Sequence, residues 1–543
     1  MLRRPIKINA GQLVTRPARS RKISPVRRTI IVCFSGSLAG VSRASTGKHL
    51  KPTRFLLISL LTLGAILVHG YHPFCEDAEI YLPGVLKILH PQMFPVGAEF
   101  FASHAHLTWF PNLIALSVRV THLPFDWALL LWHVLSVFLF LLGCYELMRQ
   151  CFPGAAADWA GVALVAALLT LPVAGTALYI LDQYLNPRNL AAFAAVFALA
   201  RVFERKYWRA GGWLAFGAVL HPLMSAFAMS LAVLLVVLDR GIDQELLRIA
   251  RGGFRSPATA LALLLPFGLS FDPPSQAYLE AMRYHTFHML GNWAWYEWLG
   301  IVAPIPVLLW LASLARRRDL ANVNLLCRAL VIYDLVYFAA ALVIQLPARF
   351  EYLARFQPLR SLHLLYILLF LLIGGFLGES WLKNRVWRWL VLFVPLCAGM
   401  FWAQRQLFPA SQHLELPGIQ PRNEWAQAFQ WIRRETSLDA VFALDPDHMN
   451  LPGEDQHGFR AMAERSMLAD AVKDSGAVSM FPPLADHWLE EVNAQRNWDK
   501  LQLQDFQQLQ SKYGVNWIVV RVPGAPGLQC PFGNAQVRVC RLR

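Results

Sequence analysis

Charged residues are scarce in this sequence. Only 16% of its 543 residues are Asp, Glu, Lys or Arg, whereas 56% are hydrophobic and 12% are aromatic. A typical soluble domain carries about a quarter charged residues. The composition therefore excludes an ordinary soluble protein of this size and is typical of a chain that crosses a membrane several times.

Acidic residues are absent from the first 54 positions, which hold thirteen Lys or Arg. This segment supplies nearly all of the net charge of +15 and leaves about +2 for the rest of the chain. The basic excess thus belongs to an N-terminal arm, and we expect no nucleic-acid partner. The arm lacks helical or strand periodicity, and its apolar segment Thr29–Val41 is shorter than the roughly 20 residues of a span. We expect residues 1–54 to be a disordered cytoplasmic arm.

Two alternatives for the arm stay open. The first is a signal peptide with Arg27 and Arg28 as its charged region, which would require Lys48, Lys51 and Arg54 to cross the membrane just before a real span. The second is an upstream mis-start of the reading frame, in which case the first 50 residues are not native.

Several common motifs are also missing. The sequence has no internal repeat and no glycine-rich nucleotide loop, and its eight cysteines show no CxxC or other metal-type spacing. Five cysteines lie in the arm, in apolar segments or beside them, and we interpret them as small core residues: Cys33, Cys144, Cys151, Cys327 and Cys397. Cys530 and Cys540 lie in the hydrophilic C-terminal region, where we expect them to close a short loop if that region faces an oxidising compartment.

Apolar runs of membrane length fill the chain from Phe55 to Phe408. Basic clusters favour the cytoplasmic side, and all of them fall there if Leu107–Leu123 lies along the outer surface instead of spanning. This topology predicts about eleven spans: Phe55–Gly70, Phe125–Met148, Trp159–Leu181, Asn189–Phe203, a short pair broken at His221-Pro222 within Gly211–Leu238, Pro257–Leu269, Leu299–Leu314, Cys327–Leu346, Leu362–Gly378 and Trp389–Phe408. A single kinked helix over Gly211–Leu238 is the alternative. It would lower the number of spans by one and would therefore no longer place every basic cluster on the cytoplasmic side.

The composition changes at Pro409. Helical patterns cover Glu424–Arg434 and Asp505–Lys512, and strand patterns cover Ala440–Leu444 and Trp517–Val522. The predicted fold is therefore mainly α: a polytopic membrane helix bundle over residues 55–408, with a first external loop at 71–124, and a small extracytoplasmic α/β domain over 409–543.

Acidic residues gather just after the first span. Glu76, Asp77 and Glu79 lie at the start of a predicted helix, where carboxylates favour the helix dipole, and this explains one or two of them. A partly desolvated carboxylate at a membrane interface also has its pKa raised toward the range of a general base. We therefore expect one of these acids to act in catalysis.

Basic residues gather in a later external loop. Arg349, Arg355 and Arg360 break the positive-inside tendency. They either snorkel to lipid head groups or pair with Glu351, or they form an anion site. A guanidinium is a fixed charge whose donors fit a phosphate. We expect an outer-leaflet cavity that Asp77 shares with at least one of these arginines and that opens sideways to the lipid.

Other residues of the outer loops carry weaker signals. The aromatic residues Trp293, Trp295, Tyr296 and Trp298 fit an aromatic belt at the membrane surface better than a sugar-stacking site. His285 and His288 lack a third ligand nearby in the sequence, and His221 is interpreted as a helix-break residue facing the cavity. The sequence therefore predicts no metal site.

The first external loop contains a short segment that resembles a motif of the glycosyltransferase C superfamily: Asp77, Ala78, Glu79, Ile80 and Tyr81. The family's first-loop motif is Asp-Glu-x-x-Tyr. The Asp and the Tyr match at this spacing, whereas the Glu is displaced by one position. These integral membrane enzymes use polyprenyl-phosphate sugars and include protein mannosyltransferases and lipid A aminoarabinose transferases. Residues 110–152 are similar to the family's surface helix and second span, and 171–193 to its next hairpin, with Asp182 and Arg188 outside. Residues 424–444 and 513–520 resemble the extracytoplasmic domain of many members.

The resemblance implies the function and its residues. It implies transfer of a sugar from a polyprenyl-phosphate donor to a hydroxyl acceptor at the outer face of the inner (cytoplasmic) membrane, with Asp77 as the general base. Glu76 and Glu79 join Asp77 as catalytic candidates, and the substrate-binding candidates are Tyr81, Asp182, Arg188, His221, Arg349, Arg355 and Arg360. The expected partners are the lipid-linked donor and membrane lipids. Some oligosaccharyl transferases bind a divalent cation at the equivalent acids, but Glu76 and Asp77 alone imply no cofactor.

Two other functions remain open from the sequence. A transporter or lipid flippase would use intramembrane ionisable groups, of which Asp334 is the only acid deep in a late span. A catalytically silent relative would act as an assembly protein through its C-terminal domain.

Overall fold

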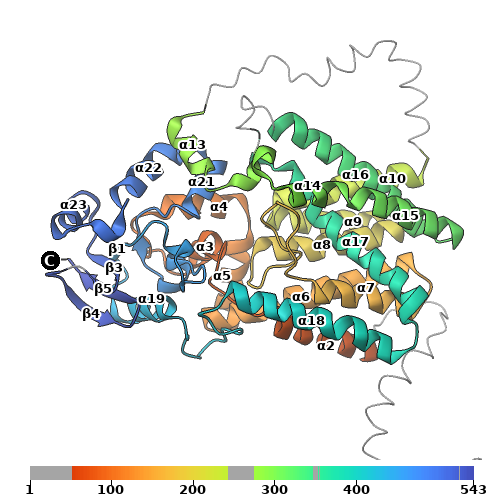
Figure 1. The fold of residues 1–543 in the computed structure, drawn as a ribbon, viewed down its shortest axis with the longest axis horizontal. Coiled ribbons are helices and arrows are strands. Elements are labelled where there is room, and N and C mark those ends of the chain that lie inside the picture. Colours follow the sequence, from red (N-terminus) through yellow and green to blue (C-terminus); the bar gives the residue numbers. More distant parts are fainter. Residues whose placement is uncertain (1–51, 242–273, 346–352, 354, 525, 543) are drawn as a thin grey trace, which may run out of the picture. The chain divides into compact units, whose positions relative to one another are not determined.

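The computed structural model describes residues 52–241, 274–345, 353, 355–524 and 526–542, so most of the predicted arm lies outside the described residues. Helices are the main elements of the described residues as far as Leu407, and a small sheet with short helices follows (Figure 1). The helices of the first part are α2 (Pro52–His69), α3 (Ala78–Leu89), α4 (Ala98–Leu107), α5 (Phe110–Thr121), α6 (Phe125–Cys151), α7 (Ala155–Ala167), α8 (Pro187–Phe203), α9 (Tyr207–Leu220), α10 (Pro222–Asp239), α13 (Gln276–Met282), η1 (Thr286–His288), η2 (Leu290–Asn292), α14 (Trp295–Val302), α15 (Pro304–Arg317), α16 (Ala321–Gln345), η4 (Pro358–Ser361), α17 (Leu362–Leu377), η5 (Gly378–Leu382) and α18 (Val386–Leu407).

Seven helical segments among the described residues are long and apolar enough to cross a membrane: α2, α6, α10, α14 with α15, α16, α17 with its flanking turns, and α18. The chain is therefore a multi-pass membrane protein. Eleven spans were predicted, but the predicted span Pro257–Leu269 lies outside the described residues. Helices α8, with 17 residues, and α9, with 14, are shorter than a full span. Helix α5 has 12 residues and is also too short to cross, as expected for Leu107–Leu123.

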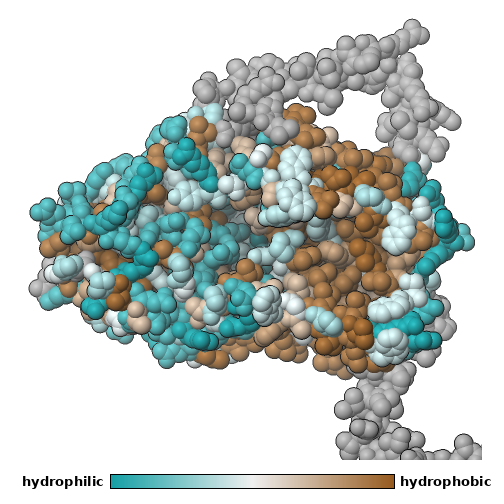
Figure 2. Space-filling view, viewed as in Figure 1, coloured by the Kyte–Doolittle hydropathy of each residue, from teal (hydrophilic) through white to brown (hydrophobic). Residues whose placement is uncertain are grey.

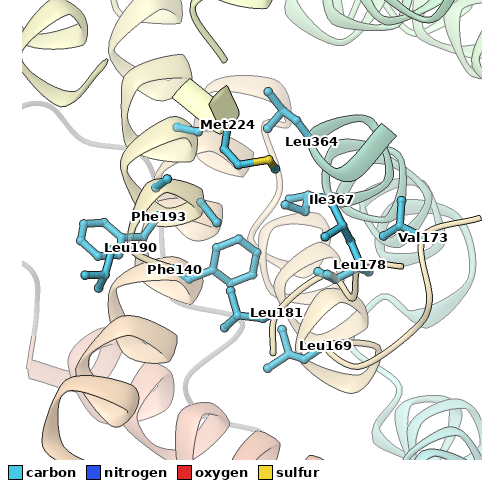
Figure 3. Packing of buried hydrophobic residues seen from close by; sticks show 14 of the residues in the cluster. Phe140, Leu169, Val173, Leu178, Leu181, Leu190, Phe193, Met224, Leu364 and Ile367 are labelled. Carbon is cyan, nitrogen blue, oxygen red and sulfur yellow. The ribbon is translucent and has the colours of Figure 1, made fainter. Parts of the chain in front are cut away.

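The predicted span Trp159–Leu181 is wrong. Helix α7 ends at Ala167, and residues 168–186 form a folded loop in which Val173 donates a backbone hydrogen bond to Leu178. The loop is apolar because it is buried in protein: Leu169, Val173, Leu178 and Leu181 pack in one cluster with Phe140 of α6 and with Leu364 and Ile367 of α17 (Figure 3). A membrane protein tolerates non-helical backbone where other parts of the protein surround it.

The predicted break at His221 is confirmed. Helix α9 ends at Leu220 and α10 begins at Pro222, and His221 between them has extended backbone angles (φ −152°, ψ 89°). A Cβ at Gly217 would lie only 2.7 Å from the Ser225 hydroxyl, although these residues are two helical turns apart in sequence. The two helices therefore fold back on each other, and a single kinked helix is excluded.

Hydrophobic side chains gather on the surface over the long helices, whereas the surface over the C-terminal sheet is mostly hydrophilic (Figure 2). Helix α18 shows this most clearly, since Leu390, Val391 and Val394 are each more than half exposed. Exposed apolar faces of this kind match a lipid environment.

The C-terminal region contains the predicted strands and helices. Its elements are α19 (Glu424–Glu435), β1 (Val441–Ala443), η6 (His448–Asn450), α20 (Phe459–Ala463), β2 (Ser466–Met467), α21 (Asp474–Met480), η7 (Pro482–Leu484), α22 (Ala485–Ala494), η8 (Trp498–Lys500), α23 (Leu503–Tyr513), β3 (Trp517–Arg521), β4 (Gln529–Gly533) and β5 (Val537–Arg541). The sheet has the order β2-β1-β3-β5-β4, with β1 parallel to β2 and β3 and with β5 antiparallel to β3 and β4. Cys530 and Cys540, which the sequence predicted to pair, form a disulfide between β4 and β5.

Candidate functional site

A cavity of about 440 Å³ lies where the loop after α2 meets the buried loop 168–186, the starts of α8 and α10, and segment 473–480 of the C-terminal region. Its charged lining residues are Glu76, Asp77, Asp182, Arg188, Arg360 and Lys473. Segments far apart in the sequence thus place three carboxyl groups and three cations around one space.

Asp77 lies at the N-terminal end of α3, and its side chain is 27% exposed. Its backbone N–H donates to the Tyr184 hydroxyl at 3.3 Å, and its carboxylate lies 3.1 Å from Lys473 Nζ and 3.4 Å from Arg188 Nη1. Burial raises the pKa of this carboxyl, but the charges of Lys473, Arg188 and Arg360 outweigh burial and hold the pKa well below its usual range. The expected rise of the pKa is therefore wrong for Asp77, because cations surround it.

The loop before α8 fixes Arg188. The Asn186 side chain caps α8 by accepting a hydrogen bond from the Asn189 backbone at 3.0 Å, and Pro187 occupies the first helical turn. Arg188 Nη2 lies 2.9 Å from Asp182, and the same guanidinium bridges to Asp77. The predicted pair Asp182 and Arg188 therefore lies in the cavity wall, with Arg188 only 4% exposed.

The three arginines of the later loop differ in position. Arg360, in η4, lines the cavity, and its guanidinium lies 5.6 Å from the centre of the Phe287 ring. No carboxylate of the described residues pairs with Arg360, and its Nε is buried without a hydrogen-bond partner. Arg355 contacts the neighbouring Phe356 ring and does not line the cavity, while Arg349 lies outside the described residues.

Lys473 was not predicted from the sequence. It precedes α21 in the C-terminal region, and its ammonium contacts both Glu76 and Asp77 across almost 400 positions of sequence. Nothing in its local sequence separates it from surface lysines, since the contact is made only by the tertiary fold. The C-terminal region therefore contributes a charged group to the cavity.

Glu79 lies outside the cavity lining and is buried against the C-terminal region. Its two carboxylate oxygens accept hydrogen bonds from the backbone N–H groups of Arg460 and Ala461 at 3.0 and 2.9 Å, and the Arg460 side chain lies 3.4 Å away. Burial raises the pKa of Glu79 to about 8, although Arg460 lowers it. This environment is that of an anchor between α3 and α20, outside the cavity lining.

The remaining predicted contacts lie at the cavity or near it. Tyr81 and His221 line it, and His221 also caps α10 by accepting from the Met224 backbone. His285 and His288 line it too, bonded to Ser475 and Gln357 at 3.0 and 2.7 Å, so they serve as polar wall groups.

Asp334, the residue of the transporter alternative, is buried in α16 and does not line this cavity. Trp293 is buried, with its indole N–H donating to the Phe287 carbonyl. Trp295 and Tyr296 are exposed, as in an aromatic belt. None of these three aromatic rings lines the cavity.

This chain is similar to several solved protein chains. No family model and no curated protein matches the sequence. The chain is similar to a structure described as the single-particle cryo-EM structure of arabinofuranosyltransferase AftD from Mycobacteria, with 14% sequence identity and a TM-score of 0.44. The likeness covers 91% of this chain and 40% of that chain, so this chain spans less than half the length of the structure it matches.

Proposed function

We propose that this protein is an integral membrane glycosyltransferase that moves a sugar from a polyprenyl-phosphate donor to a hydroxyl acceptor on the outer face of the membrane. The observation that carries the proposal is the meeting of Asp77 with Arg188, Arg360 and Lys473 around one cavity of a multi-pass membrane protein. The first-loop resemblance to the glycosyltransferase C superfamily agrees with it at Asp77 and Tyr81.

The cations fit a phosphate that gains charge. In the proposed transfer the acceptor oxygen forms a bond to the anomeric carbon, and the bond from that carbon to the donor phosphate oxygen breaks. The phosphate keeps the electron pair and becomes a monoester with one more negative charge. Fixed cations near the departing oxygen stabilise this charge in the transition state.

The three cations differ in their carboxylate partners. Arg188 is held by Asp182 and Asp77, and Lys473 by Glu76 and Asp77, whereas Arg360 has no carboxylate partner among the described residues. We therefore assign the first phosphate contact to Arg360. Arg188 and Lys473 hold Asp77 in place and complete the positive wall.

Asp77 is placed to accept the proton. The acceptor hydroxyl must lose its proton as the new bond forms, and Asp77 faces the cavity as a carboxylate that its cation partners keep ionised. Glu76 shares Lys473 with Asp77, so it serves to hold this lysine. The carboxylate of Glu79 is too far into the interface with α20 to reach the cavity, and we propose an anchoring role for it.

Competition binding tests the donor class. A photoreactive polyprenyl phosphate should crosslink to the full chain in lipid bilayers, and polyprenyl phosphate should compete with it. The neutral polyprenol of equal length should compete at least roughly tenfold more weakly, because it lacks the charge that the cations bind. Equal competition by both lipids would contradict the proposal and favour a lipid carrier that recognises only the chain.

A further inference from the structure

A second group of chemically reactive side chains lies beside the cavity, between the loop after α2 and the C-terminal region. It consists of His72, Cys75, Glu415 and His457. Candidate ligand atoms of His72, Cys75 and Glu415 all lie within 4.8 Å of one another. His457 joins them because its Nε2 lies 3.0 Å from Glu415 Oε1, and its backbone pairs with that of Cys75.

The polar atoms of this group are only partly satisfied. His72 is fully buried and stacks on the Phe408 ring, yet both of its ring nitrogens lack a hydrogen-bond partner. Its Nδ1 lies 3.6 Å from Glu415 Oε1, and Glu415 Oε2 is also buried without a partner. The Cys75 thiol contacts the Asp455 carbonyl at 3.4 Å and the side chain of His457. Buried polar atoms without partners require an explanation, and a bound ion is one of the few available.

We propose that His72, Cys75, Glu415 and His457 form a structural zinc site. Thiolate sulfur, imidazole nitrogen and carboxylate oxygen are the ligands that Zn²⁺ takes, and four protein ligands make a closed tetrahedral site. Ligand atoms about 2.0 to 2.3 Å from one ion lie roughly 3 to 4 Å apart. The distances from Glu415 Oε1 to His457 Nε2 and to His72 Nδ1, 3.0 and 3.6 Å, already lie in this range. A thiolate and a carboxylate neutralise the ion, so no net charge is buried.

The site links the two parts that build the cavity. His72 and Cys75 belong to the loop that ends in Glu76 and Asp77, while Glu415 and His457 belong to the C-terminal region. Backbone hydrogen bonds join the same two parts of the chain. The Glu76 N–H donates to the Gln456 carbonyl, and the Gly458 N–H donates to the Phe74 carbonyl. Zinc would therefore fix the loop that presents Asp77 without itself lining the cavity.

The redox setting favours a metal ligand at Cys75. The same C-terminal region carries the Cys530–Cys540 disulfide, whereas Cys75 is free and buried. A single thiol in an oxidising compartment is protected when it is bound to a metal. The sequence contains one local sign of the site, since His72 and Cys75 are three residues apart.

Metal analysis tests the site independently of transfer activity. The purified full chain is incubated with Zn²⁺, freed of unbound metal and analysed by plasma mass spectrometry. We expect one zinc ion per chain, lost in Cys75→Ser and in His457→Gln. Cys327→Ser, at a buried cysteine of α16, is the matched control and should keep the zinc, as should Glu76→Gln in the cavity.

A second measurement applies if the ligand variants do not fold. The wild-type chain loaded with Co²⁺ should show the thiolate-to-cobalt charge-transfer absorption of a tetrahedral site with a sulfur ligand. A wild-type chain with no bound zinc and no such absorption would overturn the proposal. So would zinc that persists in Cys75→Ser and His457→Gln but is lost in Glu76→Gln, since that result would place the metal in the cavity.

Discussion

Arg360 and Arg355 form a matched pair at the scale of single residues. They lie five positions apart in one loop and carry the same charge, but only Arg360 faces the cavity. The sequence around these two arginines did not show which of them lines the cavity, because an arginine that snorkels to lipid and one that binds phosphate look alike in sequence.

Substituting these two arginines separates the two roles. Arg360→Ala removes a charge-assisted contact to the donor phosphate and should weaken donor binding roughly 10- to 100-fold, the equivalent of about 1.5 to 3 kcal/mol. Arg355→Ala should leave donor binding within about twofold of wild type. Equilibrium binding of the lipid-linked donor measures both. Equal effects of the two substitutions would mean that the arginines act on lipid head groups and not on the donor.

The sequence predicted part of the site at this scale. Asp77, Asp182, Arg188 and Arg360 were found because loops between spans are short and ionisable groups there are few. Lys473 was missed because its partners Glu76 and Asp77 lie almost 400 positions away and no local pattern marks the contact. Cys75 was missed because Glu415 comes from a distant part of the chain and the short spacing to His72 was not enough by itself.

At the scale of elements, hydrophobic patterns identified most helices but not the buried loop 168–186. An apolar segment surrounded by protein has the same composition as one surrounded by lipid, so hydropathy alone could not separate them. Turn residues were the available signal, since Pro172 and Gly175 lie within the predicted span Trp159–Leu181. The break at His221 was predicted correctly because proline directly follows it.

The contact between α3 and α20 depends on a buried charge cluster. Arg460 is fully buried and lies 2.8 Å from Asp474, 3.4 Å from Glu79 and 3.9 Å from Asp470. Burial raises the pKa values of Asp470 and Asp474, and that of Asp474 reaches about 7, because several carboxyl groups share one guanidinium away from water. Protonation of a carboxyl in this cluster therefore favours the folded state.

This cluster predicts a pH dependence of stability. A carboxyl whose pKa is raised by folding contributes its full stabilisation below its unfolded pKa of about 3.9 and loses it as the pH rises through its folded value. The contribution of this cluster to the apparent melting temperature should therefore fall from pH 5 to pH 8. Buried histidines such as His448, whose pKa is lowered by burial, contribute in the opposite direction, so the cluster is tested by comparing variants. Asp470→Asn imitates the protonated form, since Asp470 Oδ2 has no hydrogen-bond partner, and it should flatten this decline.

Thermal unfolding of the detergent-solubilised chain at each pH measures the effect. Asp486→Asn, at an exposed position of α22, is the control and should leave the decline unchanged. The magnitude is about 1.4 kcal/mol for each pKa unit that separates the folded from the unfolded state. An Asp470→Asn chain whose melting temperature changes between pH 5 and pH 8 in the same way as that of the wild type would contradict this interpretation.

At the scale of the whole molecule, the proposed function requires the C-terminal region to face the outer side of the membrane. The cavity includes Lys473 of that region together with the loop after α2, so both must lie on the same side of the membrane. The positive-inside rule places that loop outside, after a first span preceded by the basic residues 1–54.

A reporter fusion checks the sidedness. Alkaline phosphatase fused after Phe408 should be active, because it folds only in an oxidising compartment outside the cytoplasm. A cytoplasmic reporter at the same position should be inactive. The reverse result would place the C-terminal region, and with it the cavity, on the cytoplasmic side.

At this scale the sequence predicted the fold class and the position of the sheet region. It predicted about eleven spans, whereas seven segments of the described residues are long and apolar enough to cross a membrane. Helices α8 and α9 are shorter than a bilayer-spanning helix, and every residue of α8 from Pro187 to Ala200 is buried among other helices. The length of a short helix inside a bundle is set by packing against other helices more than by bilayer thickness. A count of spans from hydropathy therefore does not describe such helices.

The most direct test of the account is sugar transfer by the Asp77→Asn protein. The substitution keeps the size of the side chain and most of its hydrogen bonding but removes the group that accepts the acceptor's proton. Wild-type chain in bilayers, supplied with lipid-linked sugar and acceptor, should release polyprenyl phosphate as sugar is transferred. Asp77→Asn should lower the turnover at least roughly 100-fold while donor binding stays within a few-fold of wild type. Transfer by Asp77→Asn at the wild-type rate would contradict the account and leave Asp77 as a residue that only begins a helix.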